Sequence, residues 1–167
     1  MFLDESGCNT DMTRRYAYSL GGSRAVDSAP LSKPKNTTIL SSIQLDGTLR
    51  YTTFSGGTTV ERFKRYLETD LLPHLNGNSV LIMDNMKSHH AKAVKNLLDS
   101  SGIRYTYLPP YSPDLNPIEK LWSKVKSLLR KFKARSLDAL PNAIQHAFQN
   151  VSPSDCSGWF RSCGYAI

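Results

Sequence analysis

A β-hairpin joint in the first third of the chain most constrains the fold that this sequence can adopt. Residues 37–45 and 48–54 are both rich in residues that favour strands, and Asp46-Gly47 joins them. An Asp-Gly pair between two such runs predicts a hairpin with a two-residue turn, in which both turn residues have positive φ. One antiparallel strand pair is therefore expected in whatever sheet the chain forms.

Around the hairpin, segments with helical spacing alternate with short β-rich segments. Helices are expected over residues 58–73, 90–101, 117–132 and 137–149, and further strands near residues 1–4, 16–20, 79–83 and 103–108. Elements in this order predict an α/β domain whose mixed sheet is covered by helices. A chain of 167 residues fits one such domain, which we expect over residues 1–150, followed by an irregular tail over 151–167.

The charge of the chain is unevenly distributed. Lysine and arginine number 21 against 14 acids, which gives a net charge of +7. Seven cations fall between residues 120 and 135 without an intervening acid: Lys120, Lys124, Lys126, Arg130, Lys131, Lys133 and Arg135. A basic cluster of this density favours a polyanionic partner, most often nucleic acid.

Several other classes of protein are disfavoured. No apolar run approaches the ~18 residues that a membrane helix needs, and Asp4 and Glu5 interrupt the place where a secretory signal would begin. Cys8, Cys156 and Cys163 match no common zinc or redox spacing, which indicates free thiols. We therefore expect a soluble, cytoplasmic protein without a membrane partner.

Three acids occupy places that a mixed sheet can bring to one edge. Asp4 is expected to end the first strand, Asp84 follows the apolar strand 79–83, and Glu119 opens the long helix. Open α/β sheets bind ligands beyond the carboxyl ends of their strands. Structural roles are the alternative: Asp4 as a solvated strand end and Asp84 as the cap of a turn. Glu119 also has the spacing of a capping box with Asn116.

Helical geometry places Glu119 on a polar surface. The apolar residues roughly opposite it form the expected core face, and they are Leu121, Val125, Leu128 and Phe132. Lys126 and Arg130 lie within about 40° of Glu119 around the helix axis. The acid is therefore expected on a solvated, basic face.

Three ordered segments contain these acids: FLDES at residues 2–6, MDNMKSH at 83–89 and LPPYSPDLNPIEKLW at 108–122. Together they resemble the signature motifs of the IS630/Tc1/mariner superfamily of transposases. The third segment is long and specific, and the 34 residues between Asp84 and Glu119 are the spacing of the DD34E class. The resemblance covers nearly the whole chain and is closest to the bacterial IS630 branch.

The resemblance implies a DDE catalytic domain with a ribonuclease-H-like fold, in which Asp4, Asp84 and Glu119 form the catalytic triad. Such carboxylates would hold Mg²⁺ or Mn²⁺, and two ions would assist the attacking and the leaving oxygen of an in-line displacement. Asp84 would bridge the two ions. Glu5 is expected on the opposite face of its strand from Asp4 and is left out of the triad.

Residues near the triad have expected roles of their own. The resemblance implies that Asn85, His89 and Asn116 support the carboxylates or contact the substrate phosphate. Trp122 is expected in the core. The expected contacts to DNA phosphates are Lys120, Lys124, Lys126 and Arg130.

On this resemblance, the chain would cleave phosphodiester bonds at transposon ends and transfer the freed 3′-OH to target DNA. It would act as a homodimer or higher oligomer on DNA, in the bacterial cytoplasm and associated with the nucleoid. Relatives carry an N-terminal helix-turn-helix region. Met1 stands three residues before Asp4, so that module is expected to be absent here or supplied by an upstream half.

Two other functions remain open at this stage. One is a nuclease of the same fold, such as a ribonuclease H or a resolvase-like enzyme, although the segment at residues 112–117 is not typical of either. The other is a catalytically silent DNA-binding or assembly fragment of a truncated transposase.

Overall fold

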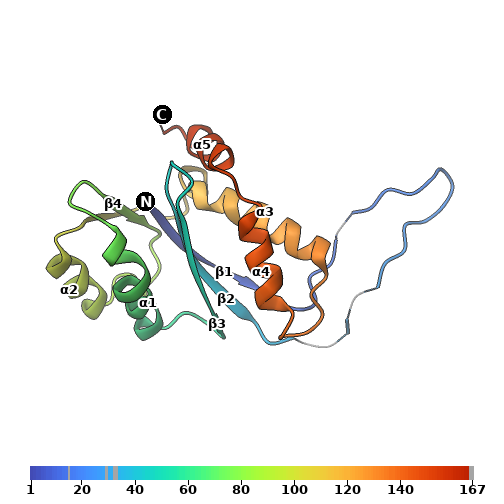
Figure 1. Cartoon of the computed structure of the whole chain (residues 1–167), viewed down its shortest axis with the longest axis horizontal. Helices are drawn as coiled ribbons and strands as arrows, with labels where there is room; N and C mark the ends of the chain where they lie inside the picture. The colour runs from blue at the N-terminus through green and yellow to red at the C-terminus, as the bar shows by residue number, and fades with distance from the viewer. Residues whose placement is uncertain (15, 29, 32–33, 166–167) are drawn as a thin grey trace.

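A five-stranded mixed sheet forms the centre of the protein, described here from a computed structural model for residues 1–14, 16–28, 30–31 and 34–165 (Figure 1). The strands are β1 (Phe2–Cys8), β2 (Thr37–Ile43), β3 (Leu49–Ser55), β4 (Val80–Met83) and β5 (Arg104–Tyr107). Their order is β3-β2-β1-β4-β5. The β1–β2 and β2–β3 pairs are antiparallel, whereas β1–β4 and β4–β5 are parallel. The predicted mixed α/β fold is therefore confirmed.

Helices pack on both faces of the sheet and enclose a separate core on each. They are α1 (Val60–Tyr66), α2 (Lys92–Ser101), α3 (Pro117–Phe132), α4 (Leu140–Gln149) and α5 (Pro153–Ser162). After α1 the chain continues as a π-helical turn over Leu67–Leu71 and a 3-10 turn over Leu72–His74. Successive residues of β1 join different cores, because Phe2 packs with α3, α4 and α5 and Leu3 packs with α1 and α2. None of the described helices is long and apolar enough to cross a membrane.

The hairpin between β2 and β3 is present, but its turn differs from the predicted one. Within residues 44–48, all of them described, only Gly47 has a positive φ, of 90°. The Gln44 amide donates to the Thr48 carbonyl oxygen, and the Asp46 carboxylate accepts from the Thr48 amide. The loop therefore has three residues and ends in a glycine bulge, a geometry that the same Asp-Gly pair also permits.

The connection between β1 and β2 extends away from the sheet (Figure 1). The strand predicted over residues 16–20 does not form there, and Tyr16, Tyr18 and Leu20 are exposed. Strand propensity alone does not order such a segment, because an isolated strand has no partner for its backbone hydrogen bonds. Residues 15, 29, 32 and 33 of the predicted loop region lie outside the described residues.

The tail predicted to be irregular contains α5, so that prediction was wrong. Ser152 and Asp155 form a complete capping box, and Pro153 stands at the first helical position. Phe160 is buried in the core that α3 and α4 also line. Residues 166–167 of the tail lie outside the described part of the chain.

Two details of the predicted helices also change. On α3, Leu129 is buried although the sequence did not place it on the core face, whereas Phe132, placed in the core by the sequence, is 40% exposed. This shift follows from the packing of α4 and α5 beside α3. The helices α2 and α4 begin at Lys92 and Leu140 rather than at residues 90 and 137.

Candidate active site

A cavity of about 520 Å³ lies where β1, β4 and the start of α3 meet. All three predicted acids line it: Asp4 comes from β1, Asp84 directly follows β4, and Glu119 lies in the first turn of α3. Most of the remaining lining comes from the loop between β5 and α3, which includes a 3-10 turn over Pro113–Leu115. The topology thus gathers acids that are far apart in the sequence.

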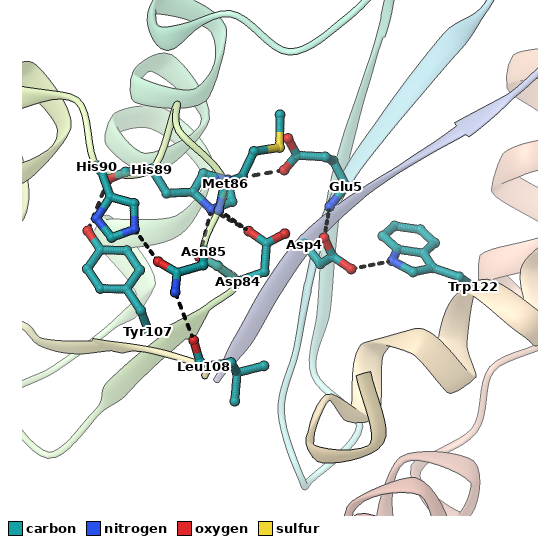
Figure 2. A network of polar contacts seen from close by, with 10 residues as sticks. All are labelled: Asp4, Glu5, Asp84, Asn85, Met86, His89, His90, Tyr107, Leu108 and Trp122. Carbon is teal, nitrogen blue, oxygen red and sulfur yellow. Dashed lines mark hydrogen bonds and ion pairs between the residues drawn. The ribbon is translucent and has the colours of Figure 1, made fainter. Parts of the chain in front are cut away.

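The parallel pairing of β1 with β4 places Asp4 beside Asp84. Leu3 pairs with Met83, so the residues that follow them are neighbours across the two strands. Figure 2 shows the two carboxylates facing each other. Asp4 does not end its strand, as the sequence suggested, because β2 pairs with β1 along its whole length to Cys8.

The Asp4 carboxylate is buried, with 6% of the residue exposed. One oxygen accepts from the Glu5 amide at 2.7 Å, and the other accepts from the indole Nε1–H of Trp122 at 3.1 Å. Burial raises the pKa of Asp4 to about 7, against the opposing effect of these hydrogen bonds and with added repulsion from Asp84 and Glu119. Trp122 is in the core as predicted, but its hydrogen bond to Asp4 was not predicted.

His89 holds Asp84 from the side opposite Asp4 (Figure 2). Nδ1 of His89 lies 2.8 Å from Oδ1 of Asp84, and Nε2 lies 3.2 Å from Oε2 of Glu5. Glu5 therefore points away from Asp4, as expected. The same Asp84 oxygen accepts from the Met86 amide at 3.1 Å, so the predicted turn-capping role of Asp84 is also present.

The charges in this group shift one another's pKa values. Burial alone would raise the pKa of Asp84, but its hydrogen bond to His89 and the charge of that ring lower it below its usual value. Burial alone would lower the pKa of His89, yet its bonds to Asp84 and Glu5 raise it to about 9. The lowered pKa of Asp84 and the raised pKa of His89 correspond to a charged imidazole between two carboxylates.

The two asparagines predicted near the acids both line the cavity. The Asn85 side chain bonds the His90 ring and donates to the Leu108 carbonyl oxygen at 3.4 Å. Asn116 is buried, and its Oδ1 has no hydrogen-bond partner in the described structure. Its side chain does not cap α3, so the alternative of a capping box with Glu119 is wrong. The backbone carbonyl of Asn116 accepts the Glu119 amide instead.

Tyr111 is a residue at this site that the sequence did not single out as functional. It lines the cavity, is fully exposed and has a φ of 56°, a left-handed conformation that is uncommon for a bulky residue. The prolines on either side restrict the loop but do not by themselves predict this conformation. Tyr111 belongs to the segment 108–122 that the sequence singled out, but nothing in that segment predicted its conformation or its exposure.

The cavity has the donor chemistry of a divalent metal site without a preformed cluster. Among the residues described, no three histidine, cysteine or acidic side chains converge closely enough to hold one ion together. The acids instead surround the cavity, whose described lining includes no lysine, arginine or histidine. Carboxylate and amide oxygens are ligands that Mg²⁺ and Mn²⁺ accept. The kinds of ligand atom that line the cavity therefore suit a divalent cation.

The predicted DNA-contact residues all lie on α3 but have different surroundings. Lys120 is exposed, whereas Lys124 forms an ion pair with Asp155 of α5. Lys126 and Arg130 line a separate cavity of about 380 Å³ beside the end of β1. Lys120 and Lys124 line another cavity beside Trp159, so the four cations lie on two different sides of α3.

Comparisons with known proteins agree with this geometry. Residues 1–141 match the family described as DDE superfamily endonuclease. The Tc1 transposase of Caenorhabditis elegans is 27% identical over 97 residues, which cover 56% of this chain and 36% of that protein.

Two solved structures show the same fold. One is a Mos1 transposase paired-end complex with the left transposon end, with a TM-score of 0.79 and 19% identity, covering 96% of this chain and 50% of that chain. The other is a Mos1 mariner paired-end complex with Mn, with a TM-score of 0.74 and 20% identity, covering 98% and 51%. The chain thus spans about half the length of these proteins and a smaller part of the Tc1 transposase.

Proposed function

The chain belongs to the DDE superfamily endonucleases, and on this premise we propose that it is the catalytic domain of a DNA transposase. One observation carries the proposal: Asp4, Asp84 and Glu119 line a single cavity whose described walls have no basic side chain. The similarity to two transposases, Tc1 and Mos1, supports the same function. The 34-residue spacing between Asp84 and Glu119 supports the finer assignment to the DD34E class and the IS630 branch.

The proposed reaction consists of two displacements at phosphorus. Water attacks the phosphorus at a transposon end, the bond from phosphorus to the 3′ oxygen breaks, and a 3′-OH and a 5′-phosphate result. That 3′-OH then attacks a phosphorus of the target strand, whose own 3′ oxygen leaves. In each step the attacking oxygen loses a proton and the leaving oxygen gains negative charge.

Mg²⁺ or Mn²⁺ is the proposed cofactor, with two ions bound by Asp4, Asp84 and Glu119. Bound divalent ions would lower the pKa of the attacking oxygen and neutralise charge on the leaving one. Asp84 is the proposed bridging ligand. The raised pKa of Asp4, which burial and the neighbouring acids cause, supports a site that is complete only with added positive charge.

Three polar residues support this site in the proposal. His89 is fully buried, so it acts on Asp84 and not on DNA. Asn85 and Asn116 line the cavity and are the proposed contacts to the substrate phosphate. Their NH₂ groups would donate to the phosphate, because the buried Asn116 Oδ1, which has no partner among the described residues, can only accept a hydrogen bond or bind a cation.

DNA is the proposed partner, and its backbone follows the cations of α3. Lys120, Lys126 and Arg130 are the principal phosphate contacts, with Lys124 contributing less because Asp155 neutralises it. We also propose a homodimer or higher oligomer on DNA, an upstream helix-turn-helix half for end recognition, and a nucleoid-associated location in bacteria. The similar Mos1 transposase structure is a paired-end complex with a transposon end, which supports the proposal of an assembly on DNA ends.

A strand-transfer assay tests the proposed function. The chain is incubated with Mn²⁺, a pre-cleaved duplex carrying the terminal repeat of its own element, and a plasmid target, beside Asp84→Ala. Joined product with the wild type alone is expected. Equal joining by both proteins would contradict the assigned site, and no joining by either would favour the silent DNA-binding or assembly fragment.

A further inference from the structure

Glu5 lies outside the proposed triad, yet its surroundings are unusual for an acid. Its side chain is 11% exposed, and Oε2 lies 3.2 Å from Nε2 of His89. The other oxygen, Oε1, is buried and has no hydrogen-bond partner among the described residues. A buried carboxylate oxygen without a partner destabilises the folded state. The presence of an acid here is therefore not explained by stability.

The ring of His89 connects Glu5 to the catalytic cavity. It is fully buried between β1 and the loop after β4, and it stacks on Phe63 with ring centroids 4.2 Å apart. The backbone carbonyl of His89 accepts a hydrogen bond from the Tyr107 hydroxyl at 3.0 Å. Nδ1 then reaches Oδ1 of Asp84 at 2.8 Å (Figure 2). A continuous row of contacts thus leads from β1 through the ring to the second acid of the triad.

We propose that Glu5 is a positioning residue, which acts through His89 to fix the orientation of the Asp84 carboxylate. The inference rests on the proposed function, because it concerns how the Asp84 ligand is presented to a metal. The bonds from His89 and the Met86 amide engage Oδ1 of Asp84, which leaves Oδ2 for the cavity. Glu5 itself reaches neither the cavity nor the substrate.

The geometry explains why a second acid is needed. Burial, the stacking on Phe63 and the Nδ1 contacts to Asp84 already restrict the ring, and the bond from Nε2 to Glu5 fixes its other end. The contacts at the two ring nitrogens, 2.8 Å to Asp84 and 3.2 Å to Glu5, therefore set the position of the ring against the Asp84 carboxylate. Partners of this kind, one step removed from a metal, commonly change its affinity by about 10–100-fold.

The test compares Glu5→Leu with Glu5→Gln by titrating Mn²⁺ calorimetrically into the full chain. Leucine fills the space but removes one partner of a buried pair, so a lower melting temperature is expected and binding is measured well below it. Glutamine keeps an acceptor oxygen for Nε2. We expect Glu5→Leu to weaken Mn²⁺ binding by about 10-fold or more and Glu5→Gln to restore affinity to within about threefold of the wild type.

Two further variants separate positioning from general packing. Tyr66→Phe removes a buried hydroxyl that bonds Ser42 on the same face of the sheet without touching Asp84, so Mn²⁺ affinity should stay unchanged. The double variant Glu5→Leu/His89→Leu should bind Mn²⁺ no more weakly than His89→Leu alone, because Glu5 acts only through the ring. Additive losses, or wild-type affinity in Glu5→Leu, would overturn the proposal.

Nitrogen NMR of the His89 ring tests the inference without metal. In the wild type we expect the Nε2 signal to show a hydrogen bond to Glu5, and in Glu5→Leu we expect that signal to shift to the position of an unbonded nitrogen. An Nε2 signal that is the same in both proteins would contradict the proposal even if Mn²⁺ binds. Absence of Mn²⁺ binding in the wild type, with the Nε2 signals as expected, would instead contradict the proposed function.

Discussion

Asp4 and Glu5 are adjacent acids on one strand, and their roles differ because the strand turns them to opposite faces of the sheet. Asp4 faces the side covered by α3, where it meets a cavity that Asp84 and Glu119 also line. Glu5 faces the side covered by α1 and α2, where it is enclosed with His89. Their chemistry is the same, so the alternation of the strand decides which acid faces the cavity and which acts through another residue.

The two faces of the sheet also differ in the partners that they provide for Asp4 and Glu5. Asp4 has hydrogen bonds from Trp122 and the Glu5 amide but no positively charged partner in the described structure, and burial, with the nearby acids, raises its pKa to about 7. His89 gives Glu5 a positively charged partner. Asp4 therefore lies open to a cation in the cavity, whereas Glu5 lies outside the cavity and is paired with His89.

The largest difference between the two acids should appear in conservative amide variants. Asp4→Asn removes a proposed metal ligand and should lower strand transfer by about 10²–10³-fold, the usual loss when a preorganised group at a reacting centre is removed. Glu5→Gln keeps its hydrogen-bond acceptor and should stay within about threefold of the wild type, as argued above for a residue outside the cavity. Initial rates with Mn²⁺ measure both, and equal losses would abolish the distinction between the two faces.

The hydrogen bond from Trp122 to Asp4 should contribute measurably to stability. Trp122→Phe leaves one carboxylate oxygen without its donor and should lower the free energy of unfolding by about 2–3 kcal/mol. Trp159→Phe is the matched control, because Trp159 packs at the edge of the same core and has no hydrogen bond from its indole in the described structure. Urea unfolding compares the two, and equal destabilisation would mean that ring volume alone matters.

DNA binding should depend on the α3 face and not on the α2 face. Lys126→Glu with Arg130→Glu should weaken binding about 10-fold or more and reduce the slope of log affinity against log salt by about two. Lys92→Glu with Lys95→Glu changes the charge equally on α2, across the sheet. Fluorescence anisotropy over a range of salt concentrations measures both, and a larger effect from the α2 pair would place the DNA on the other face.

The smallest effect should come from the link between α3 and α5. The hydrogen bond from Lys124, followed by that from the Ser152 amide, lowers the pKa of Asp155 to about 2. Because the pKa of Asp155 is lowered on folding, its carboxylate stabilises the folded state above the usual aspartate pKa. That stabilisation is lost as the pH falls through about 2. Asp155→Asn should lower stability at neutral pH by about 1 kcal/mol.

The pH dependence of unfolding checks the contribution of Asp155. Between pH 4 and pH 2, the wild type should lose more stability than Asp155→Asn, because the variant has no carboxylate to protonate there. Parallel curves for the two proteins over this range would show that the Asp155 carboxylate, with its bonds to Lys124 and Ser152, contributes nothing.

Local patterns predicted the elements and the acids, whereas long-range packing decided their surroundings. The Asp-Gly joint predicted the hairpin, and the proline-rich motif predicted the start of α3 that carries Glu119. The bond between Asp4 and Trp122 joins residues 118 positions apart, and no local pattern encodes it. The sequence correctly predicted that Glu5 points away from the triad. Its contact with His89 was not predicted, because it depends on the packing of α1 and β4 on the same face of the sheet.

Other differences arose where a local pattern was overlooked or overridden. Ser152 and Asp155 are a recognisable capping box that could have predicted α5 from the sequence. Asp4 is inside β1 because β2 supplies partners as far as Cys8, which the sequence of β1 alone does not indicate. The strand expected at 16–20 has favourable residues but no neighbouring strand in the described structure.

Locating Mn²⁺ directly would test the metal assignment most sharply. Anomalous diffraction from crystals grown with Mn²⁺ should show the ion in the cavity between Asp4, Asp84 and Glu119, bound on the Asp84 oxygen that His89 leaves free. The same peak should be absent from crystals of Asp84→Ala. Manganese bound elsewhere, or bound equally in Asp84→Ala, would contradict the assignment of these three acids as a metal-binding catalytic site.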